Sequence, residues 1–251
     1  MNSPRAESIL GRLRRTYLPW PAPSHSTRRG WRRGPLVAPF TLCYLVASWA
    51  LFLSNVERRS GKYWIDEERV DAFLFRIPDL SERPLHALAA LATAPWLNHD
   101  SEQIVYVTVL LLLFGLAFEA NEGTRTTILT FFGTTLSGAL SAGVLLHLIY
   151  PEFVDSSFLA HAWTRTWSGA SAGCFGLMGA TAARARRPWP LLALFLTWEV
   201  YVAVWQLRQY TPAFHLTALA TGFVALRYAV PWARRRGSRA AHRTLEFRGD
   251  Q

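Results

Sequence analysis

Lysine is almost missing from this chain: of its 27 Lys and Arg residues, only Lys62 is a lysine. Cysteine is also scarce: the two cysteines, Cys43 and Cys174, both lie in apolar stretches and give no support for a disulfide framework. Charged residues make up only 18% of the 251 positions, whereas 51% are hydrophobic and 11 are tryptophan. This composition is more apolar than that of a typical soluble domain and indicates a protein of the lipid bilayer.

The formal net charge of +10 rests almost entirely on arginine. Basic runs can indicate nucleic-acid binding, but here they lie at 28–33, 184–187 and 234–239, each beside an apolar stretch. Arginines in that arrangement are typical of the cytoplasmic flanks of membrane spans. We therefore predict the lipid bilayer as a partner and no nucleic acid.

Hydropathy predicts an all-α membrane protein with six spans. The spans are Leu36–Val56, Ile104–Phe118, Thr126–Ile149, Ser171–Arg184, Pro188–Leu207 and Pro212–Val230. The apolar stretch Leu85–Leu97 is expected to lead into the second span as a surface or re-entrant helix. No part of the chain has the convincing alternation of a β-strand.

Charge placement predicts that both termini are cytoplasmic. With an even number of spans, an inner N-terminus returns the C-terminus to the inner side, where the arginines of 234–248 lie. The loop at 184–187 is then also inside and carries three arginines, as the positive-inside rule requires. The predicted outer loop, 150–167, has one arginine and two acids.

These observations divide the chain into three parts. Residues 36–230 form the predicted membrane domain, and 231–251 form a basic tail that lies on anionic headgroups. Residues 1–35 are interpreted as a basic, disordered cytoplasmic tail, which places the protein in the plasma membrane of a bacterium. Their richness in Arg and Ser is also typical of a mitochondrial presequence, which stays open as an alternative.

Ser171 and His215 are the polar residues that most need an explanation. Ser171 begins the fourth span at its outward end, and His215 lies in the outward third of the sixth, so their predicted depths match. A buried hydroxyl that faces a buried imidazole is the minimal apparatus for covalent acyl transfer.

Small residues accompany this pair along both spans. They are Gly169, Gly173, Gly176 and Gly179 around the fourth span, and Ala218 and Gly222 on the sixth. Small residues let two helices approach closely in lipid. Packing alone would explain the glycines, but packing requires no imidazole.

Three ordered segments resemble the rhomboid family of intramembrane serine proteases. The run GASAGCFGLMGA at 169–180 is similar to the catalytic-serine segment of that family, and HLTALATG at 215–222 to its histidine-bearing last helix. The run GLAFEANEG at 115–123 resembles the cytoplasmic end of its second helix. The resemblance covers roughly residues 84–230.

This resemblance implies a six-helix rhomboid-like bundle with a Ser171–His215 dyad and no acidic third member. His215 takes the proton of Ser171, which attacks a scissile carbonyl in a transmembrane segment of a substrate. Phe175 is the aromatic residue that packs on the histidine ring. The expected partners are transmembrane proteins, with no cofactor, no metal ion and no particular oligomeric state.

The expected oxyanion site departs from the family pattern. The resemblance calls for asparagine at position 107 and histidine at position 103, where this chain has Val107 and Gln103. Loss of one oxyanion donor typically costs a serine hydrolase about 100- to 1,000-fold in turnover. Gln103 lies one helical turn from Val107 on the same face, and together with Gly169 and Phe175 it is the expected support of the dyad.

Two functions stay open on these grounds. One is an active intramembrane serine protease, and the other is a catalytically inactive rhomboid-like protein that binds transmembrane clients. Val107 favours the second, as does Phe214, which replaces the small residue expected before the histidine. A hydrogen bond from Ser171 to His215 favours the protease. Glu199, inside the fifth span, is interpreted as paired within the bundle or facing a wet cavity.

Overall fold

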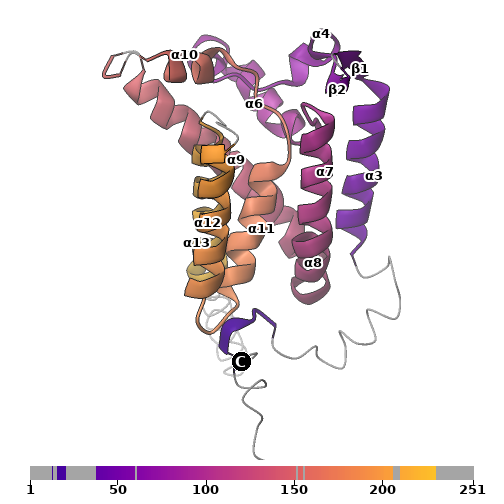
Figure 1. The fold of residues 1–251 in the computed structure, drawn as a ribbon, viewed down its shortest axis with the longest axis vertical. Helices are drawn as coiled ribbons and strands as arrows, with labels where there is room; N and C mark the ends of the chain where they lie inside the picture. The colour runs from indigo at the N-terminus through magenta and orange to yellow at the C-terminus, as the bar shows by residue number, and fades with distance from the viewer. Residues whose placement is uncertain are drawn as a thin grey trace, which may run out of the picture.

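The computed structural model describes residues 13, 16–20, 38–59, 61–150, 152–154, 156–205 and 210–229. Within these ranges the chain is mostly helical, and its longer helices form a bundle between two ends of the molecule (Figure 1). A β-hairpin and several short helices gather at one end of this bundle (Figure 1). The two predicted tails lie largely outside the described residues.

The body of the described structure consists of helical segments that coincide with the predicted spans. They are α3 Pro39–Ser54; α7 Ser101–Leu110, continued by a π-helical turn at Leu111–Gly115 into α8 Leu116–Glu122; α9 Thr124–Ile149; α11 Ser171–Ala183; α12 Trp189–Trp205; and α13 Thr211–Val224, continued by a π-helical turn at Ala225–Ala229. In the described part of the chain, two helices are long and apolar enough to cross a membrane by length and composition: Ser101–Glu122 and Thr124–Ile149. Helices Pro39–Ser54 and Trp189–Val204 are apolar but shorter.

The short elements lie mainly between α3 and α7 in the chain. They are β1 Val56–Arg59, β2 Lys62–Ile65, α4 Glu67–Val70, a 3-10 turn at Asp71–Phe73, α5 Asp79–Glu82, α6 Pro84–Thr93 and a 3-10 turn at Ala94–Trp96; α10 Ser157–Thr164 follows α9. Polar side chains are paired in this layer: Arg83 and His86 both contact the buried carboxylate of Asp79, and Lys62 pairs with Glu102 at the start of α7.

The hairpin corrects the all-α expectation. Its strands pair antiparallel with Val56 opposite Ile65, and Gly61, in the turn, adopts a positive φ of 81°. Each strand has only four residues, which is too short for alternation to stand out in the sequence. The hairpin is also bonded to the loop that precedes α7, because the Ile65 amide donates to the His99 carbonyl at 2.9 Å.

Helix α6 is separate from α7, although the two were expected to join. It ends at Thr93, and the 3-10 turn Ala94–Trp96 and the non-helical residues 97–100 separate it from α7. The Asp100 carboxylate then caps α7 by accepting the Gln103 amide at 2.7 Å. Leu85 and Leu88 of α6 are exposed, and the two predicted alternatives, a surface and a re-entrant helix, both stay predictions.

A carboxylate from another helix caps the N-terminus of α3. Residue Ala38, at the cap position, has no side chain that could accept a hydrogen bond. Glu119 of α8, which is 1% exposed, supplies both oxygens instead: it accepts the amides of Phe40 at 2.9 Å and Thr41 at 2.8 Å. The pairing satisfies helix-end donors that water cannot reach and places a negative charge at the positive end of the helix.

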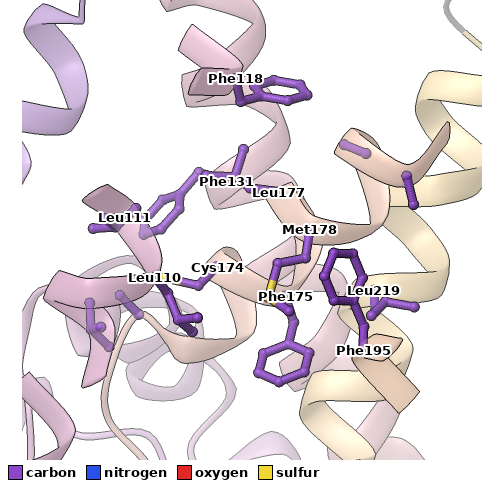
Figure 2. Close-up of a cluster of buried hydrophobic side chains, with 14 of the residues drawn as sticks. Leu110, Leu111, Phe118, Phe131, Cys174, Phe175, Leu177, Met178, Phe195 and Leu219 are labelled. Atoms are coloured by element: carbon purple, nitrogen blue, oxygen red, sulfur yellow. The ribbon is translucent and has the colours of Figure 1, made fainter. Parts of the chain in front are cut away.

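Helix α11 lies at the centre of the molecule, and all thirteen of its residues are buried. Figure 2 shows Leu177 and Met178 of α11 in one apolar cluster with Phe131 of α9 and Phe195 of α12. Against α13 the approach is closer still, because Gly179 faces the Leu219 backbone carbonyl and Gly222 faces that of Gly176. No larger residue fits these positions without moving one helix away from the other.

Residues 16–20, within the predicted N-terminal tail, contact the bundle. The Trp20 ring packs edge-on against Phe118, with ring centroids 6.1 Å apart, and its indole N–H donates to Glu122 at 3.3 Å. The Thr16 carbonyl accepts the amide of Arg187, just beyond α11, at 2.9 Å. This short segment therefore lies against the end of the bundle that is remote from the hairpin.

We expect Gly222→Ala to lower the free energy of unfolding by about 1–3 kcal/mol, because the added methyl group overlaps the Gly176 carbonyl of α11. The matched control is Gly133→Ala on α9, where a methyl group meets no atom within 4 Å. That control should change stability by less than about 1 kcal/mol. Thermal unfolding of the purified protein in detergent measures both, and equal effects would contradict the close approach of α11 and α13.

Candidate active site

A cavity lies beside the first turn of α11. Its volume is about 90 Å³, which is room for several water molecules. The walls come from α6 and the turn after it, from α7, α9, α11 and α13, and from the segment 165–169 that leads into α11, and they include Ser171, His215 and Gln103. Backbone hydrogen bonds fix that segment, because Trp167 pairs with Phe75 in both directions at 3.1 Å and 2.7 Å.

Ser171 and His215 are in direct contact at this cavity. The Ser171 Oγ lies 2.8 Å from Nε2 of His215, although 44 positions separate the two residues in the chain. Ser171 is the first residue of α11, and His215 lies in the first half of α13. Both are buried, with exposed fractions of 9% and 5%.

Glu199 of α12 contacts the other nitrogen of the same imidazole. Its Oε1 lies 2.8 Å from Nδ1 of His215, and Glu199 itself is 2% exposed. An ionised carboxylate can only accept a hydrogen bond, so this contact favours the tautomer of a neutral imidazole with its hydrogen on Nδ1 and its Nε2 lone pair toward Ser171. Of the two sequence interpretations of Glu199, the structure therefore has the paired one, and the partner is His215.

Phe175 covers one face of the imidazole. It lies one helical turn after Ser171 and stacks on His215 with ring centroids 4.2 Å apart and planes 8° from parallel. The ring is thus held by an aromatic face and by a hydrogen bond at each nitrogen, which leaves little freedom for it to rotate.

Gln103 reaches the cavity from α7, and its amide is oriented at both ends. The Oε1 atom accepts the His99 amide at 2.5 Å, and Nε2 donates to the Ser168 carbonyl at 3.1 Å. Gly169 makes room for this side chain, since a Cβ on Gly169 would overlap the Gln103 amide. Gly169 also has φ +105°, a conformation that glycine adopts without strain.

The rhomboid-domain family model matches residues 86–231, which is more than half of the chain. The chain belongs to the rhomboid family. Rhomboids are multi-pass membrane proteins and generally intramembrane serine proteases, so the resemblance predicted from the three sequence segments is confirmed at the level of the family. A search of curated proteins found no match.

Val107, at the position where the rhomboid pattern has asparagine, offers no polar group to the site. It is buried in the apolar cluster that also contains Leu110, Ala170 and Cys174. The polar side chain that reaches the cavity from this face of α7 is Gln103, one helical turn earlier.

Phe214 does not separate the serine from the histidine. Its ring packs on Trp167 at a centroid distance of 4.4 Å and forms part of the cavity wall. Of the predicted small residues, Gly173 faces Phe131 and Thr135 of α9, and Ala218 lies against Gly138 of the same helix. The predicted packing positions on α11 and α13 therefore lie against α9 as well as against one another.

The contact between Glu199 and His215 was missed by the sequence analysis, but a signal for it exists. The buried positions of α12 are Leu192, Phe195 and Glu199, spaced as one face of a helix. Glu199 also lies in the half of α12 nearer the predicted outer surface, as Ser171 and His215 do in their own helices. Within the described residues, no group of three or more His, Cys, Asp or Glu side chains could hold a metal ion.

We expect Gly169→Ala to destabilise this rhomboid more than Gly123→Ala does. Both glycines have a positive φ, which costs an alanine about 1–3 kcal/mol. Only at Gly169 does the new methyl group also displace a side chain, that of Gln103, because no atom lies within 4 Å of a Cβ at Gly123. Thermal unfolding of the two variants compares the costs, and a smaller loss for Gly169→Ala would refute the packing of Gln103 against it.

Proposed function

We propose that this rhomboid is an intramembrane serine protease that cleaves transmembrane segments of other membrane proteins. The observation that carries the proposal is the 2.8 Å contact between Ser171 Oγ and His215 Nε2 beside a cavity with room for water. A nucleophile within hydrogen-bond reach of its base, next to space for a reacting carbonyl, meets the geometric requirements of acyl transfer.

The reaction proceeds in two halves. In the first, the Ser171 oxygen bonds to the scissile carbonyl carbon and gives its proton to Nε2 of His215. That proton passes to the leaving amide nitrogen as the C–N bond breaks, and the acyl group stays on Ser171. In the second half, water attacks the ester and gives a proton to His215, which returns it to the Ser171 oxygen as the C–O bond breaks.

Gln103 and the start of α11 are the proposed oxyanion donors. The Gln103 Nε2 uses one hydrogen for the Ser168 carbonyl, and a primary amide has a second one to donate. The first amides of a helix, including that of Ser171, have no acceptor within the helix itself. Gln103 would thus take the role that asparagine, replaced here by Val107, has in the family pattern.

We further propose six membrane spans, with both termini cytoplasmic and the protein in a bacterial plasma membrane. Arg184 and Arg187, beside the residue 16–20 segment, lie at the end of the bundle remote from the hairpin. The positive-inside rule makes that end cytoplasmic. The active-site cavity then lies toward the outer surface, where water can enter it.

A client-binding protein without peptidase activity is the second candidate. The observation that favours it is Val107, whose burial among apolar side chains leaves the family's oxyanion position without a donor. This candidate predicts a folded protein whose Ser171 does not react with serine-directed reagents.

We expect the wild-type protein to be labelled by a fluorophosphonate serine probe, and both Ser171→Ala and His215→Ala to lose the label. Loss of Ser171 removes the nucleophile, and loss of His215 removes the base that accepts its proton. Ser137→Ala, which removes a part-buried hydroxyl paired with Thr221 of α13, is the matched control and should keep the label. Folded wild-type protein that takes no label would refute the protease and favour the client-binding candidate.

We expect Gln103→Leu to slow the labelling rate of folded protein by about 100- to 1,000-fold, because negative charge would then develop without a donor aimed at it. The neighbouring variant Glu102→Gln, at an exposed side chain paired with Lys62, should label at the wild-type rate. Equal rates for the two variants would exclude Gln103 from the oxyanion site and leave the backbone amides of α11 as donors.

A further inference from the structure

Helix α12 presents one carboxylate to the interior of the protein. Its buried residues are Leu192, Phe195 and Glu199, whereas Trp198 and Val200, on either side of the acid, are exposed. The inward face of α12 is thus apolar at Leu192 and Phe195 and carries the carboxyl group of Glu199 where it contacts His215. Carboxylates inside membrane proteins are costly and mark functional positions by default.

The carboxylate of Glu199 is only half satisfied. Its Oε1 lies 2.8 Å from Nδ1 of His215, while its Oε2 is buried and has no hydrogen-bond partner among the described residues. Buried polar atoms are rarely left unpaired, because each one costs its full desolvation. A neutral polar side chain could form a hydrogen bond between α12 and α13 with a smaller desolvation penalty. Helix packing alone therefore does not explain a carboxyl group at this position.

We propose that Glu199 is the third member of a Ser171–His215–Glu199 triad and acts as a positioning residue through His215. The inference rests on the proposed protease function and departs from the two-residue set that the family resemblance implies. The carboxylate holds the hydrogen on Nδ1, so that Nε2 faces the Ser171 hydroxyl as an acceptor. It also lies beside the positive charge that His215 gains when it takes the serine proton, and both side chains are buried.

The three side chains come from three different helices. Ser171 is at the start of α11, Glu199 is in α12 and His215 is in α13, so the chain order is serine, acid, histidine. Enzymes of unrelated folds assemble the same three roles from different orders, which shows that the geometry and not the scaffold defines a triad. Here the geometry is two contacts of 2.8 Å, one at each nitrogen of a single imidazole.

The test is the kinetics of a fluorophosphonate probe, in which the Ser171 oxygen bonds to phosphorus, its proton goes to His215 and fluoride leaves. The concentration dependence of labelling separates the maximal rate constant, kinact, from the probe affinity, KI. In Glu199→Gln we expect kinact to fall by about 100- to 10,000-fold, because the amide can donate to Nδ1 and reverse the tautomer of His215. KI should stay within about twofold, since Glu199 does not touch the probe.

Two further variants separate positioning from structure. Glu199→Asp keeps the charge, and we expect it to recover at least about tenfold in kinact over Glu199→Gln. Glu119→Gln changes a different buried carboxylate, the one that caps α3 by accepting the amides of Phe40 and Thr41. This variant should lower the thermal stability and leave the kinact of the folded protein unchanged.

The outcomes distinguish this inference from the proposed function. Folded wild-type protein without labelling would overturn both. Labelling of the wild type with an unchanged kinact in Glu199→Gln would overturn the triad and leave a Ser171–His215 dyad. A loss of labelling in Glu199→Gln that only follows its loss of folded protein, as judged by thermal unfolding, would also overturn the triad, because Glu199 would then be a structural residue.

Discussion

Helices α11 and α13 are in backbone contact, and α9 packs closely against both of them. Gly179 faces a carbonyl of α13, and Gly222 faces one of α11, so the helix axes lie as close as main-chain atoms allow. The proposed nucleophile and base lie a turn or more from these glycines on the same two helices. Between these two closely packed helices, Ser171 Oγ lies 2.8 Å from His215 Nε2.

Around that contact, buried polar groups are paired across helices. Glu119 of α8 caps α3, and Glu199 of α12 contacts His215 of α13. The two carboxylates differ in their partners. Glu119 accepts hydrogen bonds from backbone amides, whereas Glu199 contacts a side chain that can gain and lose a proton. The first contact stabilises a helix end, and the second lies at the only imidazole that touches the proposed nucleophile in the described structure.

The sequence predicted those features that depend on neighbouring residues or on depth. Hydropathy located the helices within a few residues, and the outward positions of Ser171 and His215 suggested that they meet. The pairing of Glu199 was not predicted: its depth matches that of Ser171 and His215, but depth does not show how α12 is rotated against α13, on which the contact depends. Gln103 was placed on a helical face, but its direction is set by the His99 amide and the Ser168 carbonyl. The hairpin was missed because four-residue strands carry too little periodicity.

The wall of the cavity is connected to the hairpin by three hydrogen bonds in series. The Ile65 amide donates to the His99 carbonyl at 2.9 Å, the His99 amide donates to Gln103 at 2.5 Å, and Gln103 donates to the Ser168 carbonyl at 3.1 Å. The part of the wall formed by Gln103 and Ser168 is therefore tied to short elements at the end of the bundle, whereas other parts of the lining come from α9, α11 and α13. The hairpin, although distant from Ser171 in the chain, thus helps to hold Gln103 in place beside the proposed nucleophile.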